Sequence, residues 1–200
     1  MSTSDGPPEL TAPGSPATII EFLYYAVNSI LFYRGVYESE DFHAVSKYEQ
    51  DLVITVHDAV ADFLNRFFRQ VEEWLEQKLI HRVILVIVSK NTGKTLERWV
   101  FNLEPHDGPP NLDKIHHKIQ ATLKQLKATI PIFPEIKEPT VFNLLAVKKD
   151  DPQSAGAPTR ENWVDAHAHA IPAENREQAA MRGFNVNDSK LDMTVVYMDQ

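Results

Sequence analysis

The sequence predicts an α+β fold in which three helices pack on one mainly antiparallel sheet. Three segments, 17–34, 58–78 and 111–129, carry apolar stripes at helical spacing. A hairpin pattern at 82–103 and alternating segments at 140–147 and 181–198 supply the strands. Since the order begins helix, helix, hairpin, helix, strand, we expect the helices to pack on one antiparallel sheet.

The first helix is predicted to be a buried pillar. Residues 17–34 are apolar on nearly every side, which is typical of a helix wrapped by other elements. Ser15 can cap its start, Pro16 fits the first helical position, and Gly35 fits the C-terminal cap. Residues 1–16 hold four prolines and two glycines, and predict a disordered leader or an arm that orders on docking.

The next two segments differ in how clearly their apolar spacing predicts a secondary structure. Residues 36–56 have apolar side chains at mixed spacing, and predict irregular backbone with one short strand at 52–56. The second helix has a regular buried face made of Val60, Leu64, Phe67, Val71 and Trp74.

The central hairpin is predicted from three adjoining patterns. Residues 82–89 (RVILVIVS) indicate a strand buried on both faces. Gly93 can adopt positive φ in the turn that follows, and Trp99 on the returning strand points toward the core. Asn111 can cap the third helix, which Pro131 and Pro134 end.

The last third of the chain is less hydrophobic. Residues 148–160 are polar and rich in helix breakers, which indicates a hinge or loop. Residues 181–186 and 191–198 predict a hairpin around a turn at 187–189. Because every core stripe precedes Val147, we expect one domain, 17–200, with its core at 17–147 and a weakly attached hairpin.

Composition narrows the class of protein. The 200 residues suffice for one domain with a full core, and the formal charge of -8 argues against a broad nucleic-acid surface. There are no cysteines, so disulfides and thiolate metal sites are excluded. No apolar run is long enough to span a bilayer, and no signal peptide is visible. We expect a soluble intracellular protein that binds neither nucleic acid nor membrane.

Candidate catalytic and metal sites are weak. His167 and His169 lie on one side of an extended segment near Asp165, but a zinc site needs further ligands. The acidic residues of the second helix lie opposite its apolar stripe, as on an ordinary solvated face. We therefore predict no enzyme activity, metal or cofactor, and keep a small metal-dependent enzyme as the alternative. Trp163 either anchors its polar segment to the body or covers a bound partner.

Several motifs resemble one family. Residues 28–37 (NSILFYRGVY) and 40–48 (EDFHAVSKY) resemble the first helix and following loop of HORMA domains. The segments LERWVFNLE (96–104), ATLKQLKATIPIFPEI (121–136) and MRGFNVNDSKLDMTVVYM (181–198) are similar to the family's spindle-checkpoint, or mitotic-arrest-deficient, branch. The motif NWVD (162–165) resembles the start of its safety belt. The resemblance covers residues 17–198.

The resemblance implies capture of a short peptide, the closure motif, under the safety belt. The peptide would add as a strand to residues 141–147, beside the third helix, and contact Phe142, Leu144 and Ala146. Arg160 and Trp163 would close over it. Open and closed states of the family differ in where the C-terminal hairpin docks, and the mobile residues here would be Phe184, Val186, Leu191, Val195 and Tyr197.

The resemblance also implies partners. The dimerisation residues map to Lys124, Gln125 and Ile132, in a homodimer of open and closed conformers. Closure motifs would come from a kinetochore coiled-coil anchor and from the activator of the anaphase-promoting complex, which the protein would inhibit. An AAA+ remodelling ATPase would act on it, in the nucleus, at the kinetochore and in the cytoplasm. The alternative is a HORMA adaptor of another pathway, either a translesion polymerase accessory subunit or a meiotic-axis protein.

Overall fold

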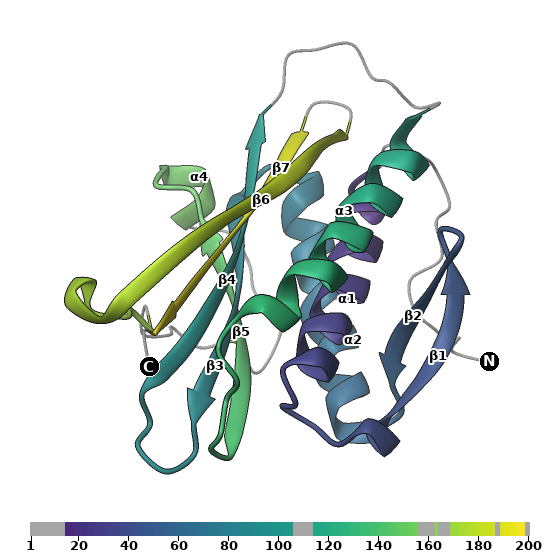
Figure 1. Ribbon diagram of the computed structural model, residues 1–200. Coiled ribbons are helices and arrows are strands. Elements are labelled where there is room, and N and C mark those ends of the chain that lie inside the picture. The colour runs from purple at the N-terminus through teal and green to yellow at the C-terminus, as the bar shows by residue number, and fades with distance from the viewer. Residues whose placement is uncertain (1–14, 106–113, 156–162, 164–168, 187–188, 199–200) are drawn as a thin grey trace.

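The computed structural model describes residues 15–105, 114–155, 163, 169–186 and 189–198. A five-stranded antiparallel sheet carries three long helices on one face, and a two-stranded sheet flanks the helices (Figure 1). The strand order of the large sheet is β5-β3-β4-β7-β6. The predicted α+β class is therefore confirmed.

Helix α1 (Pro16–Tyr33) is the predicted pillar. Its residues from Thr18 to Leu31 are all buried. Gly35 has φ 63°, and the Val36 N–H donates to the Leu31 carbonyl at 3.0 Å, which closes a Schellman cap. Ser15 takes the predicted N-cap position but donates or accepts no capping bond through its side chain.

The prediction for residues 36–56 was right about a short strand near the end and wrong about irregular backbone before it. The segment contains the short helix η1 (Ser39–Asp41) and a hairpin of β1 (Phe42–Lys47) and β2 (Gln50–Thr55). The hairpin turns at Tyr48 and Glu49, which both have positive φ, a conformation usually signalled by Gly or Asn. Tyr48 holds this conformation because its ring is buried 6.4 Å from the ring of Tyr25.

A buried carboxylate joins this hairpin to α1. Glu21 is fully buried, and its Oε1 lies 2.7 Å from Nζ of Lys47 on β1. Burial, with the nearby Glu21 charge, raises the pKa of Tyr25 to about 12 and also raises the pKa of Tyr48. Both hydroxyls therefore stay protonated around the carboxylate at neutral pH.

Helix α2 (Asp58–Glu76) ends slightly before the predicted residue 78. Lys78 has φ 58°, and the Leu79 N–H donates to the Trp74 carbonyl at 2.9 Å, so a non-glycine residue forms the left-handed cap. The predicted buried face of the helix is confirmed, with Trp74 at its end.

Strands β3 (Ile80–Ser89) and β4 (Thr95–Pro105) form the predicted hairpin. Gly93 has the expected positive φ, and Trp99 is fully buried on the helix-facing side. Ile84 and Val86 pack with Leu145 on the other side, so β3 is buried on both faces as predicted.

Helix α3 (Ile115–Thr129) leads through η3 (Ile130–Ile132) to strand β5 (Thr140–Lys148). The predicted cap Asn111 lies outside the described residues, and Lys114 occupies the N-cap position of the helix. The short helix α4 (Pro152–Ala155) follows Asp151, whose carboxylate accepts from the Ser154 N–H at 2.8 Å.

Strands β6 (Arg176–Val186) and β7 (Ser189–Met198) form the C-terminal hairpin, which pairs with β4. The expectation that the core ends before Val147 was wrong. The ring of Phe184 lies 4.8 Å from that of Phe22, inside the main core. Six hairpin side chains are buried in this core: Met181, Phe184, Val186, Leu191, Met193 and Val195.

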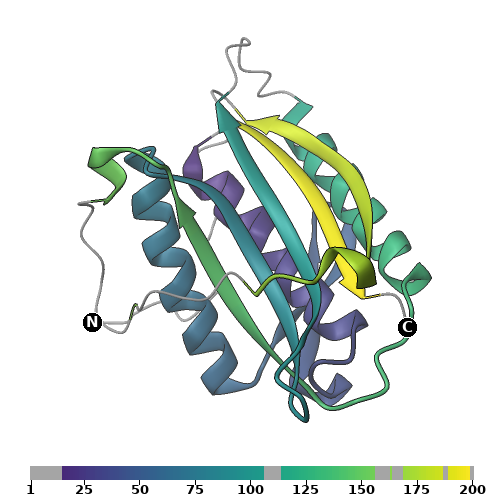
Figure 2. The same ribbon diagram turned by 90° about the vertical axis from the view of Figure 1, so that its left-hand side faces the viewer.

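The helices divide the sheet between them. Helix α2 lies behind β5 and β3, whereas α3 lies against β6 at the opposite edge (Figure 2). No long helix of the described residues covers the other face of the sheet, which we call the helix-free face. Among the described residues, no helix is long and apolar enough to cross a membrane.

Gly183→Ala tests how the C-terminal hairpin is held together. Gly183 lies where the β6–β7 register shifts, and an added Cβ would lie 1.8 Å from the Leu191 carbonyl oxygen. We expect a loss of about 2 kcal/mol or more in the free energy of unfolding, measured by urea denaturation. Gly93→Ala is the control, because that position is open and the variant should lose only about 1 kcal/mol. A smaller loss for Gly183→Ala than for the control would contradict this packing.

Candidate functional site

Strand β5 forms one edge of the large sheet. Among the described residues it pairs with β3 alone, so its outer backbone groups have no strand beside them. An unpaired edge of this length is a template for another extended chain. The C-terminal hairpin occupies the far side of the sheet, on β4, and leaves this edge uncovered.

The helix-facing side of β5 is lined by aromatic residues. The ring of Phe142 lies 5.9 Å from that of Tyr37 and 5.6 Å from that of Phe63. Leu144 is buried and Ala146 half-buried in the same core, so the prediction that these alternate residues share one face is confirmed. The predicted position beside the third helix was wrong, because β5 lies against α2 and α3 covers the opposite edge.

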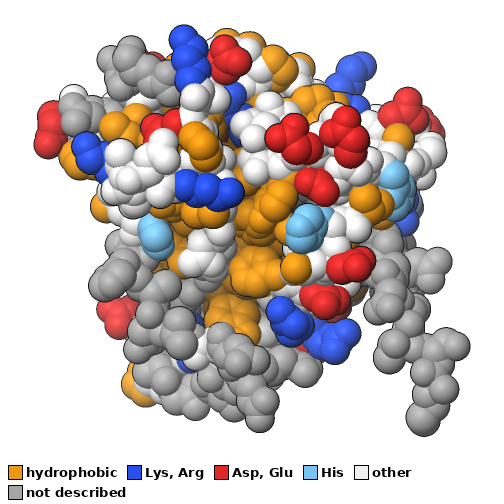
Figure 3. Space-filling model, turned by 90° about the horizontal axis from the view of Figure 1, so that it is seen from below, with side chains coloured by type: hydrophobic (Ala, Val, Ile, Leu, Met, Phe, Trp, Pro, Cys, Tyr) orange, Lys and Arg blue, Asp and Glu red, His pale blue; other side chains and the backbone are white. Residues whose placement is uncertain are grey.

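Apolar surface continues around the start of β5. Hydrophobic side chains gather in a hollow on the face of the molecule at which β5 and α2 begin (Figure 3). Val141 is 42% exposed and Val56 is 48% exposed, so both side chains offer uncovered apolar surface. An extended peptide added to β5 would pass next to Val141 and gain this contact.

Trp163 anchors its segment to α2. Its ring stacks on Phe67 at 5.2 Å and meets the ring of Trp74 edge-on at 4.7 Å. Of the two interpretations that the sequence left open, anchoring to the body is thus confirmed. Arg160, predicted to act beside Trp163, lies outside the described residues.

The chain beyond Trp163 reaches the opposite side of the sheet. The His169 ring nitrogen Nδ1 lies 3.3 Å from Oγ1 of Thr95, and residues 169–175 cross the helix-free face (Figure 2).

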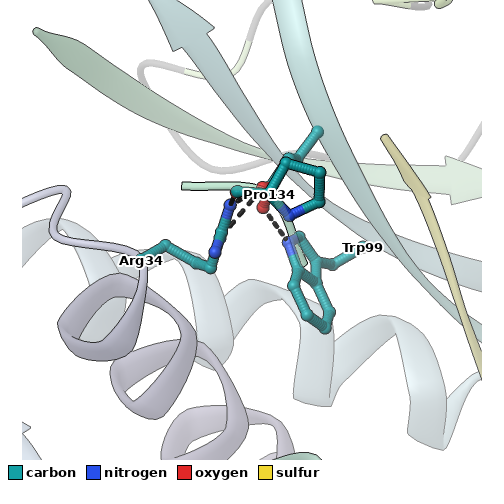
Figure 4. A network of polar contacts seen from close by, with 4 residues as sticks. Arg34, Trp99 and Pro134 are labelled. Carbon is teal, nitrogen blue, oxygen red and sulfur yellow. Dashed lines mark hydrogen bonds and ion pairs between the residues drawn. The ribbon is translucent and has the colours of Figure 1, made fainter. Parts of the chain in front are cut away.

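A buried ion pair holds β4, the strand with which the C-terminal hairpin pairs. The Arg34 guanidinium donates to Oε1 of Glu97 at 2.9 and 2.5 Å and to the Pro134 carbonyl at 2.5 Å (Figure 4). The Trp99 indole donates to the other Glu97 oxygen at 2.9 Å. The sequence motifs NSILFYRGVY and LERWVFNLE contain Arg34 and Glu97, but the pair itself was not predicted. The available signal was an acidic residue at an inward position of an otherwise apolar alternation.

The predicted dimerisation residues lie together on and after α3. Lys124 is exposed, and Ile132 is 79% exposed, the highest value among the exposed large hydrophobic side chains. Gln125 instead bonds within the molecule, since its Oε1 accepts from the Arg182 N–H of β6 at 3.2 Å. Self-association through these residues stays a prediction.

The predicted mobile residues all lie on β6 and β7. Phe184, Val186, Leu191 and Val195 are buried in the main core. Tyr197 is half-buried, with its ring 4.9 Å from that of Phe133. Their movement between two docking positions stays a prediction.

The described residues supply no set of ligands for the predicted alternative, a metal site at His167 and His169. His167 lies outside the described residues, and His169 bonds to Thr95. In the part of the chain that the structure describes, no three His, Asp or Glu side chains are grouped as metal ligands would be.

The helix-backed antiparallel sheet is the architecture of a HORMA domain. Residues 15–154 match the family model described as the HORMA domain. The chain belongs to the HORMA domain family, and the predicted resemblance is confirmed.

Within that family, the chain is similar to the MAD2 proteins. It is 36% identical over 193 residues to the mitotic spindle checkpoint component mad2 of Schizosaccharomyces pombe, and the match covers 92% of each chain. It also matches a chain of the crystal structure of the mitotic checkpoint complex, with a TM-score of 0.84, 35% identity, and coverage of 93% of this chain and 99% of that one. Caenorhabditis elegans HTP-2 bound to HTP-3 closure motif 1 shares the fold, with a TM-score of 0.76 at 10% identity over 98% of this chain and 96% of that one.

Glu97→Gln tests the buried ion pair. We expect the free energy of unfolding to fall by about 3 kcal/mol or more, because the Arg34 guanidinium stays buried without its counter-charge. Urea denaturation followed by tryptophan fluorescence measures the loss. Glu104→Gln, an exposed residue on the same strand, is the matched control and should leave the midpoint unchanged. Equal midpoints for the two variants would rule out the proposed role of the pair.

Proposed function

We propose that this protein is a spindle-checkpoint adaptor that captures closure-motif peptides on the β5 edge, and that it is not an enzyme. The observation that carries the proposal is the unpaired edge of β5, with Trp163 on one side of the sheet and His169 on the other. Similarity to MAD2 proteins supports the checkpoint role. The HTP-2 structure, bound to a closure motif, supports peptide capture on this fold.

The docking of the hairpin makes this conformer competent for capture. With β7 paired to β4, the β5 edge is free to take a peptide strand. A hairpin docked on β5 would occupy the same backbone groups and exclude the peptide. The open and closed states would thus differ in which side of the sheet, β4 or β5, carries the hairpin.

Enclosure of the peptide by the chain would control how fast the peptide dissociates from β5. A peptide on β5 would lie inside the chain segment that runs from Trp163 to His169, so it could not leave sideways while both ends of that segment stay docked. The stacking of Trp163 on Phe67 and Trp74 is the contact that would have to open first. Dissociation would then be slower than the contact area alone implies.

The finer assignments are part of the same proposal. The captured motifs would belong to a kinetochore-anchored coiled-coil protein and to the activator of the anaphase-promoting complex, and an AAA+ ATPase would reopen the closed form. Affinity purification from dividing cells, with bound motifs mapped by mass spectrometry, tests these partners. Recovery of a polymerase subunit or of meiotic-axis proteins instead would replace the checkpoint assignment.

Trp163→Ala is expected to speed peptide release about tenfold or more, because it removes the stacked anchor of the enclosing segment. Stopped-flow release of a fluorescent closure-motif peptide measures the rate. Tyr33→Ala removes a partly exposed aromatic ring elsewhere on the molecule and should leave the rate unchanged. Identical release from Trp163→Ala and wild type would refute enclosure by this segment.

Lys124→Glu is expected to weaken self-association, because it reverses the charge on the exposed face of α3. Sedimentation velocity over a range of concentrations measures the monomer–dimer equilibrium. Lys94→Glu makes the same change on the β3–β4 turn and should have no effect. A dimer of unchanged strength in Lys124→Glu would count against α3 as the interface.

A further inference from the structure

Three arginines share the helix-free face of the sheet. Trp99 and Phe101 point into the helix-side core, so Arg98 and Asn102 point to the other side. Arg82 pairs with Asn102 across β3 and β4, and its Nε donates to the Asn102 side chain at 2.8 Å. The side chains of Arg82, Arg98 and Asn102 therefore all lie on the helix-free face.

Arg176 joins the same face from β6. Arg98 pairs with Val196 of β7, and Arg176 pairs with Met198, two residues further along β7. Tyr197 between them contacts Phe133 on the helix side, so Val196, Met198 and their partners face away from the helices. We call Arg82, Arg98 and Arg176 the arginine face.

The arginine face has no acidic partner among the described residues. Arg98 Nε is buried without a hydrogen-bond partner. Burial lowers the pKa of Arg98, and the charges of Arg82 and Arg176 lower it further, so each of these two arginines acts on Arg98. Asp192 is the strand-pairing partner of Asn102, and its Oδ2 lies 2.5 Å from Nζ of Lys190.

Such a cluster is unusual in this chain. The protein has a formal charge of -8, so three arginines without an acidic partner in the described part of the chain form a local field opposite to that of the whole molecule. Guanidinium groups bind carboxylates through two parallel hydrogen bonds. Sheet geometry separates Arg98 from Arg176 by roughly 12 Å and from Arg82 by roughly 14 Å, and carboxylates on alternate residues of an extended chain repeat about every 7 Å.

We propose that the arginine face binds a carboxylate-rich extended segment of a partner protein. This surface lies on the flat of the sheet that residues 169–175 also cross, and it is away from the β5 edge, so it is separate from the proposed capture of a closure motif (Figure 2). A partner could occupy both at once, with an acidic stretch on the arginine face and another segment on the edge. The proposal does not require the closure-motif function.

The test uses the full chain and a fluorescent oligoglutamate peptide. Fluorescence anisotropy should show binding that weakens as salt is raised, and no binding of an oligoglutamine peptide. Arg98→Gln and Arg176→Gln should each weaken binding about fivefold. Arg69→Gln, an exposed arginine on α2, removes the same charge and should leave binding unchanged.

Three outcomes would overturn the proposal. They are no binding of oligoglutamate, an equal loss in Arg69→Gln, or tight binding of a phosphoserine peptide in place of oligoglutamate. Arg176 is exposed, so its variant should stay folded even where Arg98→Gln perturbs the sheet. Closure-motif release should be unchanged in both variants, which separates failure at this face from failure at the β5 edge.

Discussion

The buried pair of Arg34 and Glu97 links three parts of the fold that are distant in sequence. Arg34 follows the last turn of α1, Glu97 lies on β4, and the Pro134 carbonyl belongs to the segment after α3. An ion pair this deeply buried is costly to desolvate, and it is tolerated because each charged group has further hydrogen bonds. The pair orients β4, the strand that accepts the C-terminal hairpin, and Glu97 lies directly opposite Tyr197 of that hairpin.

Prediction from the sequence succeeded where one periodicity dominated. The stripe of α2 and the run RVILVIVS of β3 each have a single dominant pattern, and both elements were located correctly. The β1–β2 hairpin was missed because Tyr48 and Glu49 take positive φ without a glycine or asparagine to mark the turn. Burial of the Tyr48 ring favours that conformation, and this tertiary effect leaves no local signal.

The candidate site was only partly predictable, for a related reason. Residues of β5 could be assigned to one face from alternation alone, but the helix beside them could not, because strand order is a long-range property. The placement beside α3 was wrong since β7 inserts between β4 and β6 and separates α3 from β5. The role of Trp163 was undecided for the same reason, because its partners on α2 are about ninety residues away.

The glycine at the β6–β7 irregularity has a consequence for how the two edges of the sheet could exchange occupants. Gly183 fits closely under the Leu191 carbonyl, so the register between β6 and β7 is fixed within the hairpin itself. Release of β7 from β4 would break the β4–β7 ladder and leave the β6–β7 ladder intact. If the hairpin changes its docking position as predicted, it would move as a preassembled unit, and its relocation would not require the last strands of the protein to be folded anew.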